Sequence, residues 1–322
     1  MKRILVIHTG GTISMKENKE TGEVNTSSKH PLDEITTLLR GETEIEDDIL
    51  FYLPSPHIRP DHMLKLGRYI HERMSKKSFD GIVITHGTDT LEETAYFLDL
   101  FLQTRKPVVV TGAMRSSNEI GADGMYNLLS AIRVASCDEA QDKGVLVVMN
   151  DEIHTAKNVT KTSTSNVATF QSPQYGPVGV TTKNDVFFHH KMTRHDSYPV
   201  QKIDKKVSLI KAYAGMDGSL IDAVTDSGID GIVIEALGQG NLPPETVEAL
   251  QRALTKEIPI VLVSRCYQGI VQDTYGYPGG GKKLREMGII FANSLTGPKA
   301  RIKLMVALEM TQNTTELEHM FS

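Results

Sequence analysis

The chain has 322 residues, 39% apolar and 23% charged, an ordinary composition for a globular protein with a large core or two domains. Its formal net charge of -5 offers no basic surface for a phosphate backbone, so we expect no nucleic-acid partner. The two cysteines, Cys137 and Cys266, lie outside metal-ligand patterns, and no apolar run approaches the roughly 20 residues of a membrane span, so we expect neither a metal site nor a membrane segment.

The first predicted strand, Ile4-Leu5-Val6-Ile7, begins close to Met1, which leaves no room for a signal-peptide core and favours a soluble, cytoplasmic protein. It runs into Thr9-Gly10-Gly11-Thr12-Ile13. Two glycines let the backbone turn tightly, and the N–H groups of such a corner can bind an oxyanion, although a plain turn explains the pattern equally well. The polar segment Lys16–His30 that follows lacks a core pattern, so we expect either a lid over Thr12 or an exposed loop.

A second corner repeats the arrangement. The apolar run Gly81-Ile82-Val83-Ile84 leads into Thr85-His86-Gly87-Thr88-Asp89-Thr90. Both corners follow the carboxyl end of a strand, where open α/β sheets place their ligands. Asp89 is either the N-cap of the following helix or the group that holds a substrate ammonium, with Thr88 beside the reacting carbon.

A threonine becomes a nucleophile only when a base removes its proton. The residues point to three candidates for that base: His8, His86 and Lys161, the last within Val159-Thr160-Lys161-Thr162. A lysine desolvated beside Asp89 can accept a proton from a hydroxyl. The histidines each follow an apolar strand, where a satisfied core histidine is also expected.

Apolar runs and amphipathic stretches alternate along the rest of the chain. Helical spacing recurs from Leu91 to Leu102 and from Leu128 to Val134. The pattern predicts an α/β fold, with a larger N-terminal domain built on a doubly wound, mainly parallel sheet and a smaller C-terminal α/β domain with about three parallel strands. We place the domains at 1–190 and 207–322, joined by a polar linker at 191–206. Four runs read as strands buried on both faces: Val108-Val109-Val110, Val145-Leu146-Val147-Val148, Ile232-Val233-Ile234 and Ile260-Val261-Leu262-Val263.

Six motifs together resemble the bacterial-type L-asparaginase family, and the resemblance covers nearly the whole chain. The threonine motifs are highly specific in their order and spacing. The resemblance implies an amidohydrolase that converts L-asparagine to L-aspartate and ammonia through a threonine-linked acyl intermediate, without a metal or organic cofactor. The motifs are Thr9-Gly10-Gly11-Thr12-Ile13, His86-Gly87-Thr88-Asp89-Thr90, Thr111-Gly112-Ala113-Met114-Arg115, Asn158-Val159-Thr160-Lys161-Thr162, Gly238-Gln239-Gly240-Asn241 and Pro298-Lys299-Ala300-Arg301.

The resemblance also implies a role for each matching residue. Thr12 is the nucleophile. Thr88, Asp89 and Lys161 form a second catalytic cluster, in which Lys161 helps to activate Thr88 or a water and Asp89, with Thr88, binds the substrate at its α-amino group. Ser55, within Leu53-Pro54-Ser55-Pro56, binds the substrate α-carboxylate.

Subunit contacts and subtype follow from the same resemblance. Asn241 matches a residue that reaches a neighbouring subunit's site, in a homodimer or a homotetramer. Many relatives carry a tyrosine on the loop after the first motif, but this chain has none between Thr12 and Leu50, so the base for Thr12 stays open. Pro56 replaces a glutamine of the secreted relatives, which favours the cytoplasmic type. A first motif at residue 9 leaves no room for the extra N-terminal domain of the tRNA-dependent amidotransferase subunit.

Two alternatives to a strict asparaginase stay open, one within the class that the resemblance implies and one outside it. A dual-specificity glutaminase-asparaginase differs by one substrate methylene, which changes binding by only ~1–3 kcal/mol in a shaped pocket. A non-catalytic amino-acid- or nucleotide-binding module would use Gly10-Gly11 to cradle a phosphate, yet neither GxGxxG nor GxxxxGK[ST] is present. Release of ammonia distinguishes the enzyme from the binding module.

Overall fold

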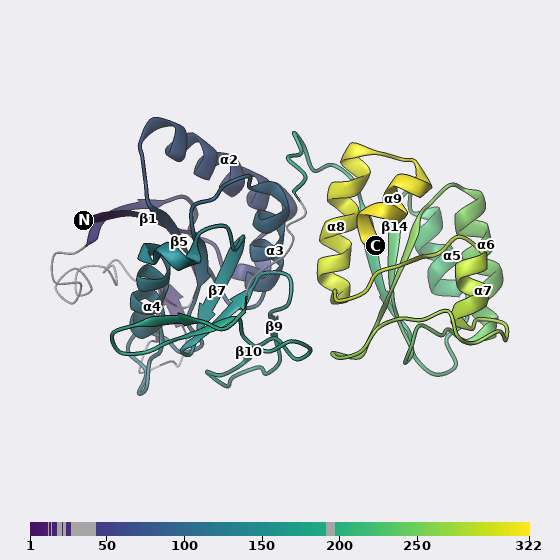
Figure 1. Ribbon diagram of the computed structural model, residues 1–322. Coiled ribbons are helices and arrows are strands. Elements are labelled where there is room, and N and C mark those ends of the chain that lie inside the picture. Colours follow the sequence, from purple (N-terminus) through teal and green to yellow (C-terminus); the bar gives the residue numbers. More distant parts are fainter. Residues whose placement is uncertain (12, 14, 18–20, 22–23, 27–42, 191–196) are drawn as a thin grey trace. The chain divides into compact units, whose positions relative to one another are not determined.

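Two sheets, one in each of two units of the chain, form the framework of the computed structural model (Figure 1). The structure describes residues 1–322 except 12, 14, 18–20, 22–23, 27–42 and 191–196. The two units are Met1–Pro199 and Val200–Ser322. The predicted linker at 191–206 stays a prediction, because six of its residues lie outside the described part of the chain.

The N-terminal unit contains an eight-stranded sheet in the order β12-β11-β8-β7-β6-β5-β1-β4. The five strands from β7 to β4 run parallel, and the three at the other end are antiparallel to their neighbours. The strands are β1 (Lys2–His8), β4 (Thr43–Ile49), β5 (Gly81–Thr85), β6 (Val108–Thr111), β7 (Val145–Met149), β8 (Glu152–Thr155), β11 (Gly179–Thr181) and β12 (Val186–Phe188).

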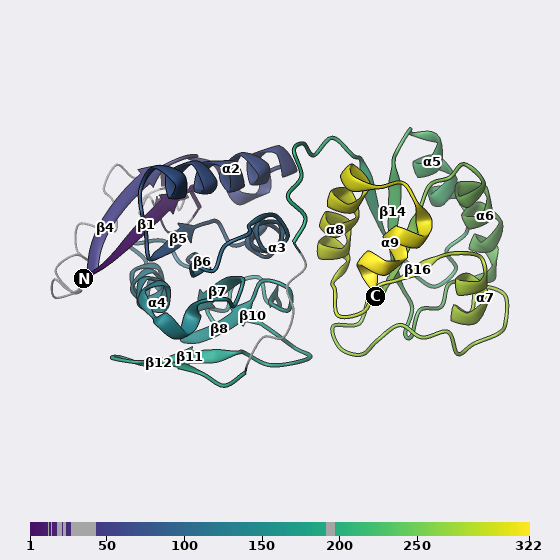
Figure 2. The same ribbon diagram turned by 45° about the horizontal axis from the view of Figure 1, so that its top comes forward.

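Helices cover both faces of this sheet (Figure 2). Helix α4 (Gly124–Ser136) packs against one face, where its buried Leu128 and Ile132 join alternate residues of the central strands such as Val83 and Val109. Side chains alternate between the faces of a strand, so the intervening buried residues point to the opposite face. Helix α3 (Leu91–Phe101) packs there with α2 (Pro60–Lys76). Short 3-10 helices are η2 (Ser55–His57) and η3 (Asp138–Ala140).

Two small antiparallel hairpins complete the described part of this unit. One pairs β9 (Thr160–Lys161) with β10 (Phe170–Gln171). The other pairs β2 (Met15–Glu17) with β3 (Val24–Thr26). The expectation of an irregular loop from Lys16 to His30 is therefore wrong for Lys16, Glu17 and Val24–Thr26, which pair as strands. Its proposed role as a lid stays a prediction.

The C-terminal unit contains a four-stranded parallel sheet in the order β13-β14-β15-β16. The expected count of about three was low because β16 has only two residues, too few for a visible pattern. Apolar residues on one face pack with α5, α6 and α7, and those on the other with α8 and α9 (Figure 1). The elements are β13 (Val207–Lys211), α5 (Ser219–Asp226), β14 (Gly231–Ala236), η4 (Pro244–Thr246), α6 (Val247–Thr255), β15 (Ile260–Ser264), α7 (Gly281–Glu286), β16 (Ile290–Phe291), α8 (Gly297–Met310) and α9 (Thr314–Phe321).

The predicted fold class is confirmed in both units. The run Val108-Val109-Val110 lies in β6, and Ile232-Val233-Ile234 lies in β14, each fully or almost fully buried. The edge strand β4 was not predicted, because its sequence Thr-Glu-Ile-Glu-Asp-Asp-Ile lacks an apolar run. Across the ranges that the structure describes, no helix is long and apolar enough to cross a bilayer.

Candidate active site

Three glycine corners meet at the carboxyl edge of the N-terminal sheet. The neighbouring parallel strands β1, β5 and β6 end there, and each is followed by a glycine that contacts the next corner. A Cβ on Gly11 would lie 2.4 Å from Gly87 Cα, and a Cβ on Gly112 would lie 2.5 Å from the His86 carbonyl oxygen. Gly10 and Gly11 also adopt φ values of 104° and 88°, which favour glycine. The backbones therefore approach as closely as they do only because side chains are absent.

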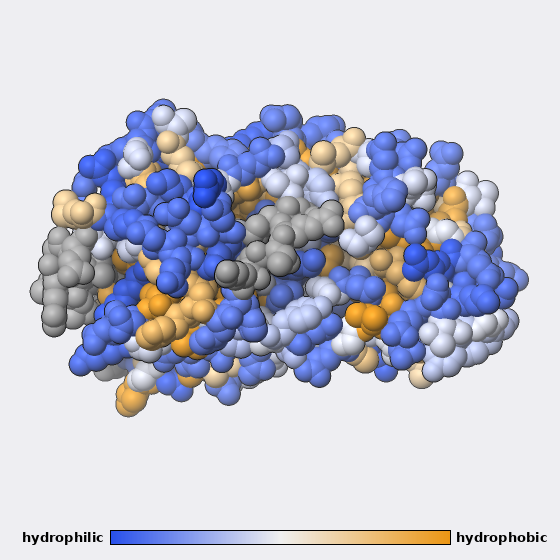
Figure 3. Space-filling view, in the orientation of Figure 1, coloured by the Kyte–Doolittle hydropathy of each residue, from blue (hydrophilic) through white to orange (hydrophobic). Residues whose placement is uncertain are grey.

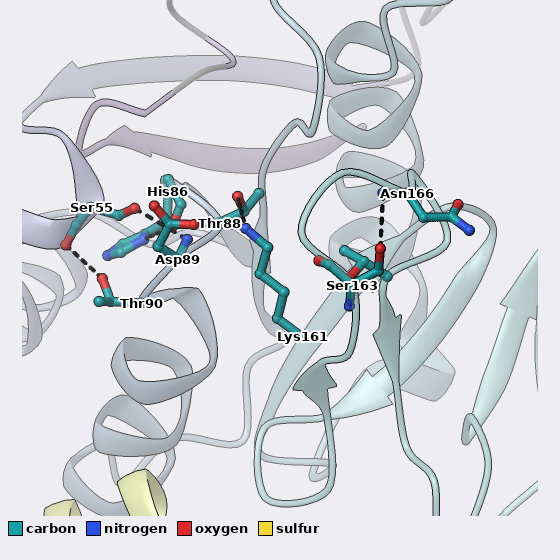
Figure 4. A network of polar contacts seen from close by, with 10 residues as sticks. Ser55, His86, Thr88, Asp89, Thr90, Lys161, Ser163 and Asn166 are labelled. Atoms are coloured by element: carbon teal, nitrogen blue, oxygen red, sulfur yellow. Dashed lines mark hydrogen bonds and ion pairs between the residues drawn. The ribbon is translucent and has the colours of Figure 1, made fainter.

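Thr88 and Asp89 lie at the second of these corners and share one partner. Lys161 Nζ donates a hydrogen bond to Thr88 Oγ1 at 3.0 Å and lies 2.7 Å from Asp89 Oδ1 (Figure 4). The lysine side chain is 16% exposed and the Asp89 side chain 59% exposed, so the pair opens to solvent on the carboxylate side. The structure thus brings together three of the predicted residues from distant parts of the sequence.

Ser55 lies on the same corner. Its side chain is buried, and its Oγ accepts a hydrogen bond from the backbone N–H of Asp89 at 3.2 Å. Thr90 Oγ1 donates to the backbone carbonyl of Ser55 at 2.8 Å (Figure 4). Thr90 was not singled out by sequence reasoning, although its place in the Thr88-Asp89-Thr90 motif was a usable signal. Two hydrogen bonds therefore hold the serine against the Asp89 corner.

The alternative role of Asp89 as a helix cap does not hold. Helix α3 begins at Leu91, so Thr90 occupies the N-cap position, and no side chain accepts a capping hydrogen bond there. The Asp89 carboxylate instead faces Lys161. Because an ion pair this exposed contributes only about 0–1 kcal/mol to stability, it has little structural purpose.

His86 is not available as a base. The imidazole is buried, its Nδ1 lies 2.8 Å from the Gly87 carbonyl and its Nε2 lies 2.9 Å from Thr94 Oγ1. A carbonyl only accepts, so Nδ1 carries the proton and Nε2 accepts from the threonine hydroxyl. Burial lowers the pKa of His86 from 6.5 to about 4. The other histidine candidate, His8, is also buried, with Nδ1 2.8 Å from Thr85 Oγ1.

Two predicted residues are not part of this described cluster. Thr12 lies outside the described residues; its neighbour Gly11 contacts Gly87, and Ile13 is buried in the core beside α4. Asn241 belongs to the C-terminal unit, where its side-chain oxygen accepts a hydrogen bond from Gly281 N at 3.2 Å. Within the described ranges, no group of three or more His, Cys, Asp or Glu side chains is arranged to hold a metal ion.

An α/β enzyme scaffold with a hydroxyl, a lysine and a carboxylate at the carboxyl edge of its sheet is the class that these features define. The family model "Asparaginase, N-terminal" matches residues 3–194, and "Glutaminase/Asparaginase C-terminal domain" matches residues 206–321. The chain therefore belongs to the asparaginase family, and the resemblance found in its motifs is confirmed.

Individual relatives agree with this assignment. The chain is 35% identical to an L-asparaginase of Bacillus licheniformis over 95% of both chains. It is 32% identical to a glutaminase-asparaginase of Pseudomonas fluorescens over 100% of this chain and 90% of that protein. The crystal structure of a probable cytoplasmic L-asparaginase from Campylobacter jejuni matches with a TM-score of 0.87 and 32% identity, over 100% of this chain and 99% of that one.

Proposed function

We propose that this protein hydrolyses L-asparagine to L-aspartate and ammonia through an acyl-threonine intermediate on Thr12. The observation that carries the proposal is the contact of Lys161 with both Thr88 and Asp89 on the corner that also holds Ser55. This set offers an anion for the substrate ammonium, a polar corner for its carboxylate and a proton-carrying pair for the reaction.

The proposed reaction has two halves. The Thr12 hydroxyl oxygen attacks the side-chain amide carbon and gives up its proton, and the carbon–nitrogen bond then breaks as ammonia leaves with an added proton. A water next attacks the ester carbon, the bond to the Thr12 oxygen breaks, and that oxygen regains a proton. We assign Lys161 and Thr88 to the movement of these protons, and backbone N–H groups of the glycine corners to the developing oxyanion.

Asp89 and Ser55 are assigned to substrate binding. The Asp89 side chain is more than half exposed, and only one of its two carboxylate oxygens faces Lys161, so it suits the substrate α-ammonium. Ser55 suits the α-carboxylate, because its Oγ accepts from the Asp89 N–H and its own hydroxyl proton can be donated to the substrate. A zwitterionic substrate is then held at both charged ends, which orients its amide.

Ammonia release from the purified protein tests the proposal. We expect release from L-asparagine, with a higher kcat/KM than for L-glutamine, and no loss of rate after dialysis against EDTA. Thr12→Ala should lower turnover at least about 10³-fold while the fold is kept. Binding of asparagine without ammonia above background would identify a binding module, and equal efficiency with both amides would identify a glutaminase-asparaginase. Unaltered activity in a folded Thr12→Ala protein would refute the assignment of Thr12 as the nucleophile.

We further propose a homo-oligomer of cytoplasmic type in which Asn241 completes the site of a neighbouring copy. The likeness to the probable cytoplasmic L-asparaginase of Campylobacter jejuni supports the subtype. Mixing inactive Thr12→Ala and Asn241→Ala proteins tests the shared site, because mixed assemblies contain sites with both residues intact. Recovery of activity on mixing is expected. Its absence, with subunit exchange verified by mass, would assign Asn241 to its own chain.

A further inference from the structure

The position of Lys161 depends on a hairpin that is not part of the main sheet. The pair β9–β10 forms its own two-stranded sheet, in which Lys161 lies opposite Phe170 and Thr160 opposite Gln171. No backbone ladder in the described residues joins these strands to β8. Contacts of side chains and turns must therefore set the distance from Lys161 Nζ to Thr88.

The hairpin is braced within itself. Thr162 N donates to the Thr169 carbonyl at 2.8 Å, and Thr169 Oγ1 donates to the Ser163 carbonyl at 2.7 Å while it accepts from Ser163 N. Asn166 N donates to Ser163 Oγ at the tip (Figure 4). Because these bonds close the hairpin directly beyond Lys161, a displacement at its base is carried to the lysine.

A buried histidine ties the exit of the hairpin to the main sheet. His154 on β8 is completely buried, and its Nδ1 lies 2.9 Å from the Oγ of Ser172, the residue that directly follows β10. The Ser172 carbonyl also accepts from Gly176 N at 2.8 Å, so the serine is held on its backbone as well. The entrance is set separately, because Thr155 O accepts from Val159 N in the turn that leads to β9.

The other nitrogen of His154 faces a carboxylate. Glu152 lies two residues earlier on the same side of β8, and its Oε2 is 3.2 Å from His154 Nε2. The imidazole beside it holds the pKa of Glu152 below its usual range. This contact lacks hydrogen-bond geometry and acts through the carboxylate charge, which favours a proton on Nε2 and leaves Nδ1 to accept from the Ser172 hydroxyl.

We propose that His154 is a positioning residue: through its buried hydrogen bond to Ser172 it fixes the β9–β10 hairpin on β8 and so places Lys161 against Thr88 and Asp89. The expected effect on turnover rests on the proposed function. The placement of the β9–β10 hairpin by His154 does not depend on it. A shift of about 1 Å in a catalytic group can lower a rate by up to ~10²-fold, so a link remote from substrate can affect kcat.

The test uses Ser172→Ala, which removes one hydroxyl, and His154→Leu, which removes the imidazole. Both should raise amide hydrogen exchange in peptides spanning 158–172 without raising it in α4. Both should lower kcat at least about fivefold with a smaller change in KM, and His154→Asn should recover part of the loss because its amide can reach Ser172. Ser136→Ala, which removes a hydroxyl bond to Ile132 O in α4, is the matched control and should change neither readout.

Two outcomes overturn the proposal. The first is unchanged exchange at 158–172 in both variants. The second concerns the loss of kcat that His154→Leu causes, and it is a loss of the same size in the Lys161→Met protein as in the wild-type protein. An effect exerted through Lys161 disappears once that lysine is gone. Exchange is measured without substrate, so a wild-type protein that releases no ammonia would refute the proposed function and still leave exchange to decide the positioning.

Discussion

At the scale of single residues, the contacts of Lys161 point most directly to a role in catalysis. It lies between a buried hydroxyl and an exposed carboxylate, and it comes from a separate hairpin. An ion pair of this exposure adds little to folding stability. Substitution of Lys161 should therefore separate catalysis from stability.

Lys161→Met should lower kcat about 10²-fold or more, because proton transfer by a positioned side chain contributes on this scale. Asparagine binding, measured by calorimetry, should change little, since Asp89 and Ser55 are kept. Lys183→Met, at an exposed lysine of the same unit, serves as control. A normal maximal rate with weakened binding would instead make Lys161 a substrate anchor.

His86 should make stability depend on pH. The unfolded histidine binds a proton below its usual pKa of 6.5, whereas the folded one binds only below about 4. Between these values the unfolded state holds more protons, so the free energy of unfolding falls as pH falls. We expect the free energy of unfolding, measured in urea, to fall between pH 7 and pH 4.5 in the wild-type protein. This fall should be about 2–3 kcal/mol smaller in His86→Gln. Equal drops would contradict the burial of a neutral His86.

At the scale of elements, the glycine corners explain why three strand ends reach one site. Gly87 lies between Gly11 and Ser55, so it sets the spacing of the first corner, the second corner and the carboxylate-binding serine. The strands alone place these corners at one edge. The lack of a Cβ atom in these glycines decides how closely the corners approach one another.

Gly87→Ala should disturb substrate binding more than the fold. The new Cβ would lie 2.7 Å from Ser55 Cβ and 2.8 Å from its Oγ, so the serine or the corner must move. We expect KM for asparagine to rise at least tenfold and stability to fall by about 1–3 kcal/mol. Gly276→Ala is the control, because its Cβ would meet nothing within 4 Å. An unchanged KM for Gly87→Ala would remove Ser55 from the binding site.

At the scale of the whole molecule, each unit has buried cores of its own. Leu128 and Val109 belong to a cluster of the N-terminal unit, whereas Leu250 and Leu262 belong to one of the C-terminal unit. Each sheet is therefore covered by helices of its own unit. The face in Figure 3 is largely hydrophilic, with apolar side chains in smaller patches.

Leu250→Ala tests how independently the two units unfold. Loss of this buried side chain from α6 should destabilise the C-terminal unit by about 2–5 kcal/mol. Hydrogen exchange should rise more in peptides from 207–322 than in strands β5 to β7. An equal rise in both units would show that the chain unfolds as one cooperative body.

The sequence by itself determined the α/β class, the central strands and the helices after them, because short apolar runs such as Val108-Val109-Val110 that alternate with helical spacing are typical of a covered parallel sheet. It also identified the family through its threonine motifs. The resemblance implied that Lys161 joins Thr88 and Asp89, but only the tertiary structure shows the contacts through which they meet. Lys161 and Thr88 are 73 residues apart, and their contact depends on a hairpin with strands of two residues, too short to show a pattern. Likewise, only folding shows that His86 is buried with both nitrogens engaged, since side-chain partners arise from packing rather than from local spacing.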